Sequence, residues 1–304
     1  MTNEKLYAII DGAVEDGLMP MLAELDPPAA CLYAPPVQPD LVDIAPYVVL
    51  VDDDVKEWLD AREKPWGIYI STDADLKNIR SHLRKYLYVL LPDSEKPVFF
   101  RFYDPRNIWD FIAVLSDWEL HSFMGPVTKI ATNLDGEEKE RDFTERRAQF
   151  PMDSISTVSM LAISQDQYEQ IQNKKRTDYV NDLAEQMEDW HEYFQEEKAN
   201  GEEELPKVYT LHYHEVEAQK ATEQPEKSKP DFQIFAKDLV AYLAKNDIED
   251  DRSIRSLAQL VIEKEFTALS EFPAHYSEQL ERTDQPGHFK AEALLLSETG
   301  QIPS

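Results

Sequence analysis

Short apolar runs alternate with helix-like patterns over the first part of the chain. The runs have the length and composition of strands, and they cover residues 6–10, 47–51, 66–70, 87–91 and 98–103. Between them, apolar residues at helical spacing, such as Leu18, Leu22 and Leu25, predict helices with one apolar face. Strands interleaved with helices predict an α/β N-terminal lobe, in which a mixed sheet is flanked by helices.

Polar residues mark where several of these helices begin. Asp104 can cap a helix whose first turn holds Pro105 and whose apolar face continues through Ile108 and Phe111. Thr72 and Asp75 have the spacing of a capping box before a second apolar stripe, Leu76, Ile79, Leu83 and Leu87. The acidic run 52–54 follows a strand, where carboxylates either hold magnesium or cap a helix, and we favour the cap.

The pattern changes after residue 130. Residues 133–147 are almost entirely polar and charged, which predicts an exposed loop or a boundary between lobes. We therefore expect two domains, an α/β lobe over residues 1–130 and a mostly α-helical C-terminal lobe over residues 131–304. Residues 158–163 could add one more strand, and residues 217–230, with no aliphatic side chain larger than alanine, predict a flexible linker.

Helical spacing dominates the second lobe. A long helix is predicted from a heptad-like stripe that runs through Val180, Leu183, Met187, Trp190 and Phe194. Two shorter helices follow the linker, the first with Phe232, Phe235, Leu239 and Leu243, and the second with Ile254, Leu257, Val261 and Leu269. A stripe at this spacing forms part of a core or lines a groove for a partner helix, and the core is the more common outcome.

Charge narrows the classes of function. The chain has 60 acidic and 31 basic side chains, a formal net charge of −29, which disfavours binding to nucleic acid and to anionic membranes. The same field would attract a basic protein partner, although acidity also serves solubility. With one cysteine, Cys31, no export-like start and no apolar run near the roughly 20 residues that cross a bilayer, we expect a soluble cytoplasmic protein.

Motifs of catalysis do not stand out. The sequence has no GxSxG elbow, no HExxH helix and no GxGxxG loop, and small and apolar residues surround Cys31 rather than cations that would activate it. His212 and His214 could face the same way on a strand, as metal ligands do, but no other histidine stands at a ligand spacing. We therefore expect no enzyme, no cofactor and no metal, and a metal-dependent hydrolase is the weakest alternative.

The run VFFRFYDPRNIW, residues 98–109, is the most distinctive part of the sequence. As a strand, it would place Arg101 and Tyr103 on one face and two phenylalanines on the other. Arg101 needs a partner, which is either an internal carboxylate such as Asp11 or a protein ligand at the end of the sheet. Arg106, in the first turn of a helix, is expected to be the more accessible of the two arginines.

Several motifs occur in the order found in one known family. The motifs IIDG, APYVV, WGIYIS, HLRKYLYV and above all FRFYDPR, within residues 6–127, resemble the type VI secretion effector chaperone domain of the Tap or Tec adaptors. The unit from residue 158 to about 194 is similar to the usual continuation of that family. The resemblance implies a non-enzymatic loader, which binds the N-terminal or transport region of a toxic effector and helps mount it on the VgrG spike.

The resemblance carries a set of positions over to this chain. They are Asp11, Trp66, Gly67, Arg101, Tyr103, Asp104 and Arg106. By their chemistry Asp11, Gly67, Asp104 and Pro105 are expected to hold the fold, and Trp66 is either core or an anchor for a partner. The predicted partner-binding residues are Trp66, Arg101, Tyr103, Arg106, Trp190 and Phe194. An immunity-like protein, whose acidic surface neutralises a toxin domain, is the competing hypothesis.

Overall fold

The structure, a computed structural model, describes residues 4–134, 136–151, 160–200 and 230–301. It divides into two units, residues 1–174 and 175–304, and the division falls inside the long helix α8 (Gln165–Asn200). The predicted lobes, 1–130 and 131–304, place the boundary earlier in the chain. The predicted linker 217–230, except for its last residue, and the pair His212 and His214 lie outside the described residues.

A six-stranded sheet forms the centre of the first unit. Its strand order is β2-β3-β1-β4-β7-β8, and every neighbouring pair is antiparallel. The strands are β1 (Lys5–Asp11), β2 (Ala29–Cys31), β3 (Pro46–Leu50), β4 (Gly67–Thr72), β7 (Val127–Leu134) and β8 (Glu137–Asp142). The predicted runs at 6–10, 47–51 and 66–70 thus correspond to three adjacent central strands.

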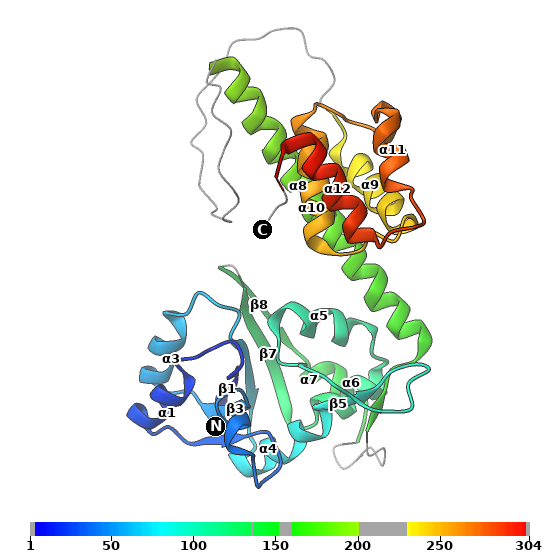
Figure 1. Ribbon diagram of the computed structural model, residues 1–304. Coiled ribbons are helices and arrows are strands. Elements are labelled where there is room, and N and C mark those ends of the chain that lie inside the picture. Colours follow the sequence, from blue (N-terminus) through cyan, green and yellow to red (C-terminus); the bar gives the residue numbers. More distant parts are fainter. Residues whose placement is uncertain (1–3, 135, 152–159, 201–229, 302–304) are drawn as a thin grey trace. The chain divides into compact units, whose positions relative to one another are not determined.

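Alternate residues of the central strands enter two separate cores. Tyr7 and Ile9 of β1 pack in a core with α4 (Leu76–Leu83), α5 (Pro105–Val114) and α6 (Asp117–Met124). Ala8 and Ile10 face the other way and pack with α1 (Leu18–Leu25) and α3 (Asp53–Asp60). Figure 1 shows α1 and α3 on one side of the sheet and α5 and α6 on the other. Because successive side chains of a strand point to opposite faces, both faces of the sheet are covered by helices, and the unit has three layers.

A smaller sheet lies on the α4 and α5 side of the unit, because its middle strand belongs to the same core. β5 (Tyr88–Leu90) pairs antiparallel with β6 (Val98–Phe99) and parallel with β9 (Leu161–Ala162). The mixed pairing that the sequence predicts occurs in this sheet, whereas the six-stranded sheet is antiparallel throughout. The predicted fold class, an α/β first part and a mostly helical second part, is confirmed.

Two segments differ from their predicted structures. The run 98–103 is a strand only at Val98–Phe99, and the backbone then turns, with Asp104 N donating to Arg101 O at 3.1 Å. Phe102 and Tyr103 are both buried, which consecutive residues of a half-buried strand cannot be. The charged stretch predicted as a loop over 133–147 contains β8 and the short helix α7 (Thr144–Arg147). Every side chain of β8 is exposed, so its composition resembles that of a loop.

Capping residues explain where three of the helices begin. Asp104 accepts a hydrogen bond from Arg106 N at 3.0 Å and opens α5, and Asp52 accepts one from Val55 N at 2.9 Å and opens α3. Both were predicted from the sequence. The cap of α4 is Asp75, which accepts from Asn78 N at 2.8 Å, rather than Thr72. The Thr72 hydroxyl accepts from Ala74 N and donates to Pro126 O at 2.8 Å, so it joins β4 to the segment before β7.

The second unit is built from helices around one core. The part of α8 from residue 175 packs with α9 (Phe232–Lys245), α10 (Asp251–Glu263), α11 (Ala274–Leu280) and α12 (Gly287–Thr299). A 3-10 turn, η2 (Leu269–Glu271), lies between α10 and α11. Lys290 is buried, and its Nζ donates to Asn246 O at 2.6 Å, at the end of α9 where carbonyls have no helical partner. In the part of the chain that the structure describes, no helix is long and apolar enough to cross a membrane.

Candidate partner-binding site

The end of β1 holds a buried carboxylate. The Asp11 side chain is 4% exposed, its Oδ1 accepts a hydrogen bond from Ala13 N at 3.0 Å, and its Oδ2 pairs with Arg101 Nη2. Of the two predicted partners of Arg101, an internal carboxylate and a protein ligand, the structure thus contains the first. The Arg101 side chain is still 37% exposed, so the pair lies where the core meets the surface.

Asp104 and Arg106 form a second, local ion pair. Asp104 Oδ1 accepts from Arg106 Nε at 2.9 Å, and Oδ2 accepts from Arg106 Nη2 at 2.7 Å, a two-pronged geometry that fixes the guanidinium. Burial disfavours the charged form of Asp104, but these hydrogen bonds and the charge of Arg101 outweigh it and lower the pKa of the carboxyl. Arg106 is exposed, as predicted, and it is held in place by the residue that caps α5.

The other residues of the first unit that were singled out through the family resemblance are buried. Tyr103 and Trp66 lie inside the two cores, and burial, followed by the charge of Asp11, raises the pKa of Tyr103. Gly67 lies so close to β1 that a Cβ would stand 1.9 Å from Ile9 O. Pro105 is buried in the first turn of α5. These residues hold the fold in this structure, and the prediction that Trp66 and Tyr103 bind a partner stays a prediction.

Next to the Asp11 and Arg101 pair, aromatic rings are exposed to solvent. We call Tyr33, Tyr88, Val98 and Phe99 the aromatic surface. The exposed fractions of Tyr88, Val98 and Phe99 are 48%, 36% and 40%. Phe99 lies between the two tyrosines, with ring centroids 6.0 Å from Tyr33 and 5.6 Å from Tyr88 in edge-to-face geometry. The rings thus form a contiguous patch rather than scattered side chains.

Tyr33 joins the aromatic surface to the ion pair. Its pKa is raised by burial first and then by the charge of Asp11, and the charge of Arg101 acts on it in the opposite direction. The aromatic surface was not predicted from the sequence, because the run at 98 was expected to form a longer strand with two distinct faces. The two consecutive apolar residues of β6, Val98 and Phe99, are the signal that could have indicated it, since an edge strand of two residues cannot bury both.

The predicted residues of the second lobe lie in or against the core of the second unit. Met187 and Phe194 are buried, and Trp190 is partly buried and packs on the same core. The stripe on α8 therefore contacts other helices of its own unit, as the core interpretation predicts. The prediction that Trp190 and Phe194 bind a partner stays untested.

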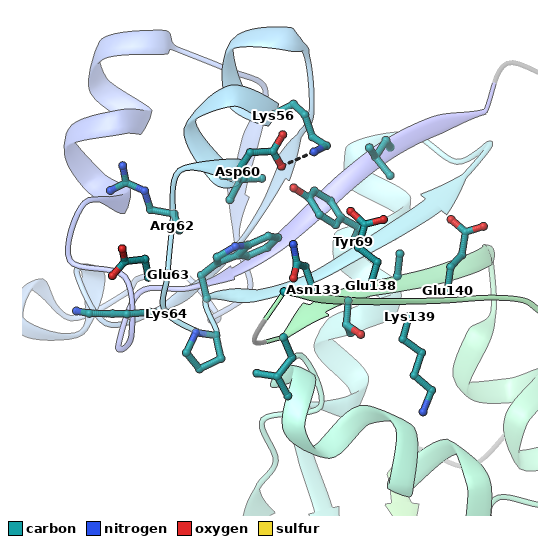
Figure 2. A pocket seen from close by; sticks show the side chains of 18 residues that line it. Lys56, Asp60, Arg62, Glu63, Lys64, Tyr69, Asn133, Glu138, Lys139 and Glu140 are labelled. Carbon is teal, nitrogen blue, oxygen red and sulfur yellow. Dashed lines mark hydrogen bonds and ion pairs between the residues drawn. The ribbon is translucent and has the colours of Figure 1, made fainter. Parts of the chain in front are cut away.

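A separate pocket lies on the α3 side of the six-stranded sheet. It has a volume of about 430 Å³ and is lined by residues of α3, β4, β7 and β8. Figure 2 shows the Tyr69 ring between Lys56 and Asp60 of α3 and Glu138 of β8. Burial, followed by the charges of Asp60 and Glu138, raises the pKa of Tyr69. Cations and carboxylates alternate around this pocket, so its charge favours no single class of ligand.

Across residues 4–134, 136–151, 160–200 and 230–301, no three histidine, cysteine, aspartate or glutamate side chains are grouped closely enough to hold a metal ion. Cys31 is a free, partly buried thiol at the end of β2. The histidine pair at 212 and 214 lies outside these residues.

These features define a class of protein, in which an α/β unit with an aromatic surface is followed by a helical unit. Residues 6–122 of this chain match the family described as Domain of unknown function (DUF4123). This segment is therefore a domain of that family, which is the type VI secretion effector adaptor, or chaperone, family that the motifs resemble. The predicted family is confirmed, and it supports a general role as an adaptor for type VI effectors.

The family match has a definite extent. It begins in β1 and ends in α6, so it lies entirely in the first unit and includes Asp11, Arg101 and the aromatic surface. No curated protein and no solved structure matches the chain. The second unit must therefore be interpreted from its own residues.

Proposed function

We propose that this chain is a non-enzymatic, cytoplasmic adaptor that binds the N-terminal or transport region of one type VI effector and promotes its loading onto the VgrG spike. The observation that carries this proposal is the aromatic surface within the family domain. Protein interfaces concentrate their binding energy in a few aromatic and arginine side chains. The aromatic surface and the neighbouring Arg101 provide that combination.

The position of Arg101 supports a contact there. Its Nη2 pairs with Asp11, whereas its Nε is buried and has no hydrogen-bond partner within the described part of the chain. A buried donor without an acceptor is unfavourable, by about 1–3 kcal/mol. A partner carbonyl or carboxylate that docks over the aromatic surface could shift the guanidinium and satisfy this donor. Binding would then relieve an existing cost as well as bury the rings.

The experiment compares two fragments of the effector encoded in the same gene cluster as this chain. One fragment holds the N-terminal transport region and the other the C-terminal toxin domain. The tagged full chain is mixed with each fragment, and binding is measured by isothermal titration calorimetry. An adaptor binds the N-terminal fragment and then co-elutes with VgrG when VgrG is added, whereas an immunity-like protein binds and inhibits the toxin domain.

A pair of double variants tests the site. Tyr88→Ser/Phe99→Ser removes two rings of the aromatic surface, and Tyr193→Ser/Phe289→Ser removes a tyrosine and a phenylalanine of similar exposure, 45% and 52%, in the second unit. We expect the first variant to lose tenfold or more in affinity for the N-terminal fragment, about 1.4 kcal/mol, and the second to bind like the unchanged chain. Equal affinities for the two variants, or binding of the toxin domain alone, would overturn the proposal.

A further inference from the structure

The outer side of α4 and the turn that follows it, η1 (Arg84–Tyr86), carries a cluster of cations. We call Lys77, Arg80, Arg84 and Lys85 the basic face. Together with Ser81 they line one hollow of about 460 Å³. Lys77, Arg80 and Arg84 are separated by three and four positions, a spacing that brings side chains to one side of a helix, and Lys85 follows Arg84 in η1. The opposite side of the same helix, with Ile79 and Leu83, is buried in the core.

The basic face is rigidly supported. Arg80 Nε donates to Cys31 O at 2.6 Å, and its Nη2 donates to Tyr33 O at 3.1 Å. These two bonds tie α4 to the segment after β2, so one cation of the face is fixed by backbone carbonyls rather than by a carboxylate. The backbone of Tyr33 that accepts this bond belongs to the aromatic surface, and Tyr88 follows η1 within two residues. The two surfaces are therefore adjacent.

Among the residues that the structure describes, no ion pair joins Lys77, Arg84 or Lys85 to a carboxylate. The acids nearest in the sequence lie at the N-terminal end of α4, beside Lys77: Asp75 caps the helix through Asn78 N, and Asp73 precedes it. From residue 77 to residue 85 the sequence holds four cations and no acid.

This absence of local neutralisation contrasts with the composition of the chain. Acidic side chains outnumber basic ones by 60 to 31, so a group of four cations with no carboxylate partner among the described residues stands out against the average surface. At physiological ionic strength, charges farther than about 8 Å are largely screened. An anionic molecule close to the basic face is therefore attracted by its positive charge. The same molecule is repelled where it comes close to the acidic parts of the surface. The face orients an anionic partner as well as attracting it.

We infer that the basic face binds an acidic segment of the protein that docks on the aromatic surface. The identity of that protein as an effector rests on the proposed function, whereas the recognition of acidic side chains rests on the basic face itself. A short acidic peptide contacts only this face. A nucleic acid is disfavoured, because its evenly charged backbone would also lie along the acidic parts of the surface.

The test uses the full chain and a fluorescent, glutamate-rich peptide as the probe, with binding measured by fluorescence anisotropy. Lys77→Glu/Lys85→Glu reverses two charges of the basic face. The matched control, Lys237→Glu/Lys245→Glu, reverses two exposed lysines at the same spacing on α9, and both variants change the net charge equally. A neutral variant, Lys77→Gln/Lys85→Gln, replaces the charge-reversal variant of the basic face if that variant does not fold. Thermal unfolding checks that each variant is folded.

We expect the unchanged chain and the control to bind the glutamate-rich peptide, and the basic-face variant to bind at least tenfold more weakly. Added salt should weaken binding, and the corresponding glutamine-rich peptide should not bind. The inference is overturned if the control and the basic-face variant bind equally, if the glutamine-rich peptide binds as tightly, or if duplex DNA is the preferred ligand. It is also overturned if the charge reversal only abolishes self-association of the chain in size-exclusion chromatography.

The assay separates this inference from the proposed function, since it contains no effector. If the glutamate-rich peptide binds through the basic face while the effector fragments do not bind, the proposed function fails and the inference stands. If the N-terminal fragment binds equally to the unchanged chain and to the basic-face variant, and the peptide does not bind at all, the inference fails and the adaptor role stands.

Discussion

The inner and outer sides of the same two segments differ sharply in chemistry. In α4 the inner side buries Ile79 and Leu83, and the outer side presents the basic face. In the run that starts at residue 98, Phe102 and Tyr103 enter the core while Val98 and Phe99 stay exposed. The inner residues include much of the motif that carries the family resemblance. The resemblance assigns no role to the outer residues, which are those of the basic face together with Val98 and Phe99.

This difference indicates how one adaptor fold can serve different partners. The buried residues of the motif fix where the short strand β6 and the helices α4 and α5 lie, so they are needed whatever protein is bound. The exposed residues beside them can change without disturbing the core, and they are the part of the surface that a partner can contact. Changes to inner residues should therefore alter stability, and changes to outer residues should alter binding.

The largest effect is expected from His82, which lies on the inner side of α4. Burial lowers the pKa of His82 from 6.5 to about 4, although its ring Nε2 lies 2.7 Å from Phe123 O. The unfolded chain takes up this proton near pH 6.5 and the folded chain only near pH 4, so stability is lost as the pH falls through that interval. The loss should total about 3 kcal/mol.

Urea unfolding of the unchanged chain and of His82→Gln, measured from neutral pH down to about pH 4.5, checks this effect. Other groups titrate in both proteins, so the difference between the two pH dependences is the quantity to compare. His288→Gln, which replaces an exposed histidine of α12, is the control and should change the pH dependence less than His82→Gln does. The interpretation of His82 as a partly buried, neutral residue is wrong if His82→Gln and the unchanged chain lose stability in parallel.

A smaller loss of stability is expected from Arg101, which lies between the buried and the exposed residues. Arg101→Ala leaves the buried carboxylate of Asp11 without its counter-charge. Breaking a fully buried pair costs about 3–5 kcal/mol, and the partial exposure of Arg101 reduces the expected loss of stability to about 2 kcal/mol. Asp11→Asn in the same chain should recover part of this loss, because no unpaired charge then remains.

The control for Arg101 is an ion pair on the surface. Arg282→Ala breaks the exposed pair with Asp284 and should leave the unfolding midpoint unchanged. Chemical unfolding of all four proteins gives the comparison. An Arg101→Ala protein as stable as the Arg282→Ala protein would show that the pair with Asp11 does not support the fold, and Arg101 would then belong with the outer, binding residues.

Much of the fold could be predicted because the local patterns agree with it. The apolar runs of β1, β3 and β4 are bounded by turns, and the caps Asp52 and Asp104 stand directly before helices with one apolar face. The partner of Arg101 could be predicted because an arginine beside a sheet needs a carboxylate, and Asp11 ends the first strand.

Other features depend on contacts between distant residues and could not be predicted. The order of the six strands, with β7 beside β4, is set by packing across the sheet, and β8 has no buried face that would distinguish it from a loop. The aromatic surface requires that Tyr33 meet Phe99, sixty-six positions later in the sequence, and a period of two in the run at 98 pointed to a longer strand. The cations of the basic face are present in the sequence, but only the structure shows that no carboxylate among the described residues pairs with Lys77, Arg84 or Lys85.

Hydrogen–deuterium exchange with and without the N-terminal effector fragment tests the central claim most directly, because it locates the contact in the intact chain. The account predicts that bound effector slows exchange in residues 31–33, in α4 and η1, and in β5 and β6, where the aromatic surface and the basic face lie. Protection confined to α8 to α12, or to the pocket around Tyr69, would contradict it and assign effector binding to another part of the chain.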